Sequence, residues 1–202
     1  LYLDGSGVKQ DRAKAAEAFE MAATHDKPAA LFNLALLHLE GKVRPRDMAR
    51  VLDLFRRAAE RGNAEAQYGL AQLYMNGEGV PQDDELATEW LGKAARAGHV
   101  AAMVEYAIRL FNGKGIEADA IAAAQWFRRA ADAGNPIAQN RYARLLAAGR
   151  GVPPDPVEAA KWHLVAARSG AKDDWLDRFV SDLSEVQRQQ ATAAAERWPA
   201  GG

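Results

Sequence analysis

The chain has 202 residues, of which 49% are hydrophobic and 26% are charged, so its composition is globular and excludes a disordered or fibrous protein. Its 26 Lys and Arg residues nearly cancel its 27 Asp and Glu residues, which argues against binding to nucleic acid or to an anionic membrane surface. Cysteine is absent, which excludes a disulfide framework, a thiol nucleophile and a thiolate metal site.

No apolar run approaches the roughly 18 residues that would span a bilayer, so we do not expect a membrane-spanning protein. The chain begins at Leu1-Tyr2-Leu3 without an initiator Met or a signal-like segment. We therefore expect it to be part of a longer protein.

Two kinds of residue recur along the chain with a constant step of 36 residues, as from Gly5 to Gly41. The two columns are Gly5, Gly41, Gly77, Gly113 and Gly149, and Asp11, Asp47, Asp83, Asp119 and Asp155. A fixed period of roughly 20–50 residues is the signature of a repeat architecture. The predicted organisation is a partial unit (1–26), full units 27–62, 63–98, 99–134 and 135–170, and a tail (171–202).

Each full unit is predicted to contain two helices, as the third unit illustrates. Residues 64–75 place apolar side chains at helical spacing, and Gly77 suits a left-handed C-terminal cap. Asp83 suits the N-cap of a second helix that ends at Gly98. The Gly98 column contains glycine in every full unit, with Asp26 as the exception in the partial one. A lone hairpin buries too little apolar surface to offset its ordering entropy, so the units should stack into a solenoid.

The tail has no 36-residue match and predicts a helical cap on the fifth unit. Residues 174–183 are amphipathic, and Ser184-Glu185-Val186-Gln187 is a capping box that opens a last helix through Trp198. We expect Pro199 to Gly202 to be frayed.

The arrangement of Gly77, Gly79, Asp83, Trp90 and the pair Ala94-Ala95 resembles the Sel-one-like repeat family of the tetratricopeptide-like superfamily. The resemblance covers residues 1–170. It implies an all-α fold, a right-handed α/α solenoid (superhelix) of 36-residue helical hairpins with a C-terminal helical cap. It also implies a non-enzymatic adaptor with the first helix of each hairpin on the concave face. In the second unit Val43-Arg44-Pro45 replaces the Gly-Val pair, and we expect that loop to differ in shape.

Candidate binding residues follow an i, i+4, i+7 spacing on the predicted concave helices. They are Phe32, Leu36, Leu39, Tyr68, Gln72, Met75, Val104, Ile108, Phe111, Asn140, Arg144 and Ala147. The aliphatic members fit a packed core as well as a groove. The polar members Tyr68, Gln72, Asn140 and Arg144 are better candidates for a groove that binds a protein segment.

Other motifs favour structural roles. The four histidines fall at different places in the repeat and no pair has i,i+3 or i,i+4 spacing, so we expect no metal site and no cofactor. The Gly-x-Gly segments are not followed by Gly-Lys-Ser/Thr and repeat with the unit, which indicates a turn and not a phosphate loop. Basic residues such as Arg56, Arg57 and Lys93 have acidic neighbours at helical spacing, which indicates a solvated face.

We therefore expect a non-enzymatic scaffold that binds a protein or peptide on its concave surface and regulates a signalling or envelope complex. The alternative is a carbohydrate- or peptidoglycan-binding module that uses Tyr68, Tyr106, Tyr142 or a tail tryptophan as a stacking platform. The arrangement of repeats and tail is similar to alphaproteobacterial repeat proteins that are often exported, which favours the periplasm over the cytoplasm. The truncated first unit predicts end-to-end self-association.

Overall fold

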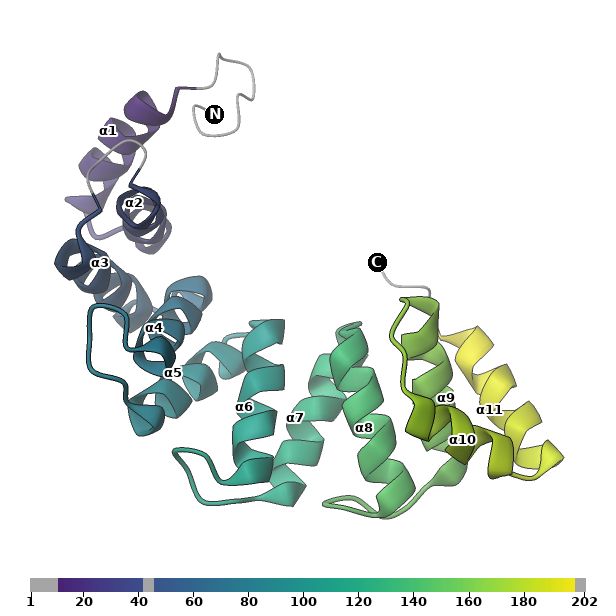
Figure 1. Ribbon diagram of the computed structural model, residues 1–202. Coiled ribbons are helices and arrows are strands. Elements are labelled where there is room, and N and C mark those ends of the chain that lie inside the picture. Colours follow the sequence, from purple (N-terminus) through teal and green to yellow (C-terminus); the bar gives the residue numbers. More distant parts are fainter. Residues whose placement is uncertain (1–10, 42–45, 199–202) are drawn as a thin grey trace. The chain divides into compact units, whose positions relative to one another are not determined.

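The computed structural model describes residues 11–41 and 46–198, and all regular secondary structure in these ranges is α-helical (Figure 1). The helices are α1 (Arg12–Ala23), α2 (Pro28–Glu40), α3 (Met48–Glu60), α4 (Ala64–Asn76), α5 (Asp84–Arg96), α6 (Val100–Asn112), α7 (Ala120–Asp132), α8 (Pro136–Ala148), α9 (Pro156–Arg168), α10 (Asp174–Asp182) and α11 (Glu185–Arg197). The expectations for residues 1–10, for the loop at Val43 and for the end after Trp198 lie outside these ranges.

Helices that are adjacent in the sequence pack on one another within two compact units. The first unit contains α1 to α5, and each of these helices contacts the next. The second unit contains α6 to α11, in which α6 to α9 pack successively and α11 covers α9. The hairpins are α2–α3, α4–α5, α6–α7 and α8–α9, so the predicted all-α fold of stacked helical hairpins is confirmed.

The aspartate column begins the second helix of every unit, as predicted. Each carboxylate accepts a hydrogen bond from a backbone N–H in the first turn of its helix and satisfies a donor that has no partner within the helix. The accepting residues are Asp11, Asp47, Asp83, Asp119 and Asp155. The first helices end as predicted on glycines in the left-handed conformation, with φ of 67° at Gly41, 69° at Gly77 and 64° at Gly149.

The Gly98 column also adopts positive φ, and Asp26 adopts it without being glycine. φ is 93° at Gly98 and 51° at Asp26, which is the non-glycine residue with positive φ in the described part of the chain. The Asp26 carboxylate accepts hydrogen bonds from Arg57 Nη2 at 2.7 Å and from Arg61 Nη2 at 2.5 Å. The Arg57 hydrogen bond lowers the pKa of Asp26 below its ordinary value. The side chain thus ties the end of α1 to α3 across the first repeat boundary.

The second glycine of the Gly-x-Gly loop is required by a tertiary contact. A Cβ added to Gly151 would lie 1.9 Å from the carbonyl oxygen of Ala120, at the start of α7 in the preceding repeat. A Cβ on Gly79 would lie 3.1 Å from Met48 Cβ, which opens α3 at the same repeat offset. This loop therefore packs its backbone against the previous hairpin, which supports the prediction that it is a structural turn.

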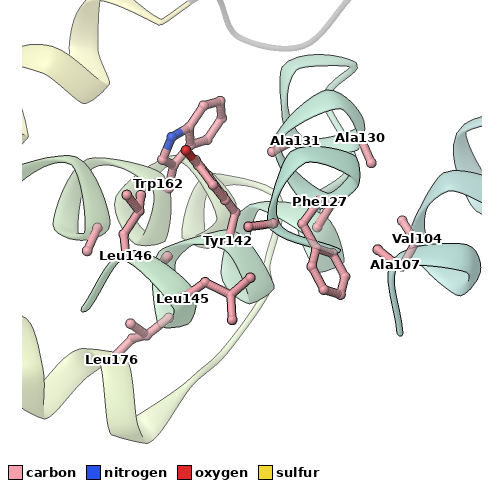
Figure 2. Close-up of a cluster of buried hydrophobic side chains, with 14 residues drawn as sticks. Val104, Ala107, Phe127, Ala130, Ala131, Tyr142, Leu145, Leu146, Trp162 and Leu176 are labelled. Atoms are coloured by element: carbon pink, nitrogen blue, oxygen red, sulfur yellow. The ribbon is translucent and has the colours of Figure 1, made fainter. Parts of the chain in front are cut away.

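The core of the second unit is built from large and small side chains in alternation (Figure 2). Tyr142 and Trp162 meet edge to face with ring centroids 6.2 Å apart, while alanines such as Ala130 and Ala131 let neighbouring helices approach closely. Val104 is also buried here, at 6% exposure, so this residue of the predicted groove belongs to the core instead.

The tail caps the fifth repeat, as its pattern predicts. The ring of Trp198 packs at 4.7 Å from that of Trp162, and Arg168 Nη1 donates a hydrogen bond to the carbonyl of Ala195 at 2.7 Å. Ser184 and Gln187 form the predicted capping box at the start of α11. Leu176 of α10 is fully buried in the core of the second unit, so both tail helices close its end.

Candidate protein-binding cleft

The twelve candidate binding residues all lie on the first helices of the hairpins, α2, α4, α6 and α8. Val104 is buried in the core of the second unit and Ala147 packs against that core. Of the other ten, nine are half-buried and Arg144 is exposed. They are Phe32, Leu36 and Leu39 on α2, Tyr68, Gln72 and Met75 on α4, Ile108 and Phe111 on α6, and Asn140 and Arg144 on α8. The structure brings Ile108, Phe111 and Arg144 together in one cleft of the second unit.

The other candidates have different neighbours. Phe32 stacks on the buried ring of Phe55 at 5.8 Å and packs, like Leu36 and Leu39, against the core of the first unit. Tyr68 stacks on His99 at 4.3 Å. Asn140 faces His163, with 3.4 Å between Asn140 Oδ1 and His163 Nδ1. These side chains are half-buried, and none of them is among the residues that line the cleft.

The cleft has a volume of about 320 Å³ and opens between α6, α7, α8 and α10. It is lined by Ile108, Phe111, Asn112, Phe127, Arg141, Arg144, Leu145, Ala148, Arg150 and Trp175. Phe127 and Leu145 belong to the buried core, so the floor is apolar and rigid. Pockets of about 300–1,000 Å³ with apolar walls and a few polar groups are the usual form of a binding site.

Arg144 holds the rim of the cleft through a bidentate ion pair with Asp173. Arg144 Nε and Nη2 each donate to an Asp173 carboxylate oxygen at 2.7 Å. The same carboxylate caps α10 by accepting from the backbone N–H groups of Trp175 and Leu176. The hydrogen bond from Arg144 lowers the pKa of Asp173 and, reciprocally, raises the pKa of Arg144. The Arg144 guanidinium also lies 5.3 Å from the centre of the Trp175 ring.

Within the described residues, the two other arginines of the cleft form no ion pair with a carboxylate. Arg150 places its guanidinium 4.4 Å from the centre of the Phe111 ring. Arg141 is exposed one helical turn before Arg144 and, within residues 11–41 and 46–198, makes no hydrogen bond or ion pair. The cleft therefore combines an apolar floor with cationic groups at its opening, an arrangement suited to binding.

Sequence reasoning missed Arg141 and Arg150, and it considered Trp175 only as a tail tryptophan for the sugar-binding alternative. Arg141 precedes Arg144 by three residues, so helical spacing was a signal for it. Arg150 lies in the Gly-x-Gly loop that directly follows α8, where the pattern indicates only a turn. Trp175 lies in the tail, which the 36-residue period does not connect to α8.

Of the rings proposed for sugar stacking, Trp175 remains the most accessible at 41% exposure. Tyr142 is buried at 6%, and Tyr106 packs edge-on against Trp126 at 5.7 Å. Among the described residues, no group of histidine and acidic side chains is placed to hold a metal ion, and no helix is long and apolar enough to cross a membrane.

The stacked hairpins define the class of an α-helical repeat protein. The Sel1 repeat family matches five successive segments, 1–27, 28–63, 64–99, 100–135 and 136–170. The chain therefore belongs to the Sel1 repeat family. Sel1 repeat proteins generally act as protein-interaction scaffolds, and the fold is typically non-catalytic.

Solved structures of similar proteins support this assignment. A Sel1 repeat protein from Oxalobacter formigenes is 28% identical with a TM-score of 0.76, over 98% of this chain and 84% of that one. The uropathogenic Escherichia coli protective antigen c5321, which has an SLR fold, is 26% identical with a TM-score of 0.56, over 97% of this chain and 50% of that one. This chain thus spans half the length of c5321.

A more distant structure shares the fold alone. Helicobacter pylori cysteine rich protein B is 20% identical with a TM-score of 0.51, over 65% of this chain and 94% of that one. Among curated proteins, none matches this chain significantly.

Proposed function

We propose that this protein is a scaffold that binds a segment of a partner protein in the cleft between α6, α8 and α10. The observation that carries the proposal is the cleft itself, where Ile108, Phe111 and Arg144 converge with Trp175. The cleft is open to a partner, and its floor consists of core residues that need no rearrangement. Aromatic and arginine side chains are the residue types that most often dominate the binding free energy of protein interfaces.

Candidate residues outside the cleft can also contribute to the affinity for the partner protein. The half-buried residues Phe32, Leu36, Leu39, Tyr68, Gln72 and Met75 lie on the corresponding helices of the first unit and Asn140 lies beside the cleft on α8. Under this proposal the residues of each unit are additional contact residues for a partner protein. The finer role, regulation of a signalling or envelope complex, and an exported location belong to the same proposal. They rest on the resemblance of the sequence to repeat proteins that are often exported. Fractionation of the source cells that finds the protein in the cytoplasm contradicts the exported location.

The proposal is tested by filling the cleft. Ala148 is exposed at the end of α8 and lines the cleft, so Ala148→Trp should occupy it without changing any charge. Ala133→Trp is the matched control, because Ala133 is exposed at the end of α7 and is not a lining residue. Affinity capture from source lysate and envelope fractions identifies a partner, and binding of that partner is then measured for each variant.

We expect Ala148→Trp to weaken partner binding by about tenfold or more and Ala133→Trp to leave it within about twofold. Circular dichroism of both variants checks that the helices are retained. A partner that binds the Ala148→Trp variant as tightly as the parent chain contradicts the proposed site.

A further inference from the structure

The charged residues that line the cleft are all positive. Its lining contains three arginines, Arg141, Arg144 and Arg150, and no acidic residue. Arg144 is neutralised by Asp173, whereas Arg141 and Arg150 have no ion pair within the described residues. The chain as a whole has a formal net charge of −1, so this local excess of positive charge is a property of the cleft.

Asp173 shows how a carboxylate is bound at this rim. Its two oxygens lie 2.7 Å from Nε and Nη2 of Arg144, and the guanidinium lies near the face of Trp175. A planar guanidinium favours this bidentate geometry with a carboxylate. Arg141 lies on the same face of α8 because residues three apart on a helix are neighbours. A second carboxylate at Arg141 would therefore lie beside the one already bound.

The apolar floor of the cleft favours an apolar group of a ligand and not a carboxylate. Ile108, Phe111 and Leu145 line the cleft, and Phe127 closes it from α7. The volume of about 320 Å³ is at the lower end of the range for ligand pockets, which suits one large side chain together with adjoining backbone. An aromatic or long aliphatic residue fits this floor, because it buries apolar surface on binding.

From these observations we infer that the occupant of the cleft is an acidic peptide segment that carries an aromatic or long aliphatic anchor residue. Its carboxylates pair with Arg141 and Arg150, and the anchor seats on the floor between them. The inference rests on the proposed function and specifies its partner class. A nucleic acid fits less well, because its recognition needs a basic track along the backbone and the cations here surround one short apolar cleft.

The test uses a fluorescein-labelled synthetic peptide with a central Phe flanked by two Glu on each side. Two matched peptides replace all Glu by Gln, or Phe by Ala. Fluorescence anisotropy with the full chain gives each dissociation constant. We expect each replacement to weaken binding by about fivefold or more, and added salt to weaken binding of the Glu peptide most.

Protein variants locate the binding. Arg141→Glu and Arg150→Glu should each weaken binding of the Glu peptide by about fivefold to tenfold. Each substitution removes an attraction to the peptide carboxylates and adds a repulsion. Arg128→Glu is the control, because Arg128 is exposed on α7 outside the cleft lining, and its Nε lies 3.9 Å from the Asp132 carboxylate. It should change binding by less than about twofold.

Three results overturn the inference: equal binding of the Glu and Gln peptides, no saturable binding of the Glu peptide up to about 1 mM, or tighter Arg141-dependent binding of a short single-stranded DNA. Failure of the inference is separable from failure of the proposed function. A partner that is lost in Ala148→Trp while the Glu peptide does not bind leaves the scaffold proposal intact and rejects only the acidic partner class.

Discussion

At the scale of single residues, positions that look equivalent in the repeat are held by different forces. Gly149 and Gly151 both adopt positive φ, at 64° and 69°. A Cβ at Gly149 would meet Pro154 at 3.4 Å, whereas one at Gly151 would meet the backbone carbonyl of Ala120 at 1.9 Å. The first glycine is needed for its backbone conformation and the second also for the approach of another repeat.

This difference predicts unequal costs for two alanine substitutions in one loop. Gly149→Ala should lower the free energy of unfolding by about 1–2 kcal/mol, the cost of a left-handed residue with a side chain. Gly151→Ala should lower it by about 3 kcal/mol or more, because a backbone atom cannot move aside as a side chain can. Urea denaturation measures both. Equal destabilisation would contradict the close approach to Ala120.

Asp26 gives a residue-scale prediction that depends on pH. Its pKa is lowered in the folded chain, mainly by the Arg57 hydrogen bond, so it stabilises the fold above its unfolded pKa of about 3.9. That contribution is lost as the pH falls through the lowered folded value. Asp26→Asn should therefore be less stable than the parent at neutral pH, and the two should converge in acid.

Thermal unfolding of both proteins from about pH 7 to about pH 2 checks this prediction. Asn tolerates the left-handed conformation at least as well as Asp, so a loss of stability in Asp26→Asn reports the loss of the charge and not backbone strain. A stability difference that persists unchanged at the acid end would show that the ion pairs with Arg57 and Arg61 are not its cause.

At the scale of elements, helix ends follow local rules, but the position of α10 depends on tertiary contacts. Asp173 caps α10 and is bound by Arg144 of α8, 29 residues earlier in the chain. Leu176 anchors the helix in the core of the second unit, and Trp175 and Phe179 stack on each other at 5.8 Å. The element that completes the cleft is therefore fixed by a charge and a buried leucine.

Two substitutions at Asp173 separate its roles. Asp173→Ala removes both the cap and the ion pair and should lower the free energy of unfolding by about 1–3 kcal/mol. Asp173→Asn retains an oxygen for the cap and should cost less than Asp173→Ala. Chemical denaturation gives the totals, and amide hydrogen exchange in α10 shows whether the loss is local. If Asp173→Asn is as damaging as Asp173→Ala, the cap contributes little and the charge carries the effect.

At the scale of the whole molecule, the first matched repeat, residues 1–27, is shorter than the four that follow. Its helix α1 packs on α2 and leaves Met21 73% exposed. In a repeat protein each unit covers the apolar face of its neighbour, so the exposed Met21 side chain on α1 is a candidate contact with another copy.

We therefore predict that this chain self-associates end to end. Sedimentation velocity should show an average mass that rises with protein concentration, and Met21→Glu should shift the equilibrium toward monomer. Ile121→Glu is a control of similar exposure on α7, where the side chain is 63% exposed. A monomer mass that does not depend on concentration would refute the prediction.

The sequence by itself determined the repeat unit, the helix pairs and their ends. Asp83 and Gly77 act on backbone groups within a turn of themselves, and the 36-residue period repeats that information, so local chemistry was enough to locate the helices. The capping box at Ser184 was readable for the same reason. For the candidate site, helical spacing predicted three of the residues that line the cleft, Ile108, Phe111 and Arg144.

Only the tertiary structure decided which of those side chains share a cleft. Trp175 comes from the tail, and its approach to α6 and α8 depends on how α10 docks through Asp173 and Leu176. Arg150 comes from the loop after α8 and lies over the ring of Phe111, 39 residues earlier in the chain. The tertiary structure also placed Val104 in the core, turned Asn140 toward His163 and set Ala120 against Gly151. Such contacts join residues that are distant in the sequence, and a periodic pattern carries no information about them, because every unit shares the pattern while each cleft depends on its particular neighbours.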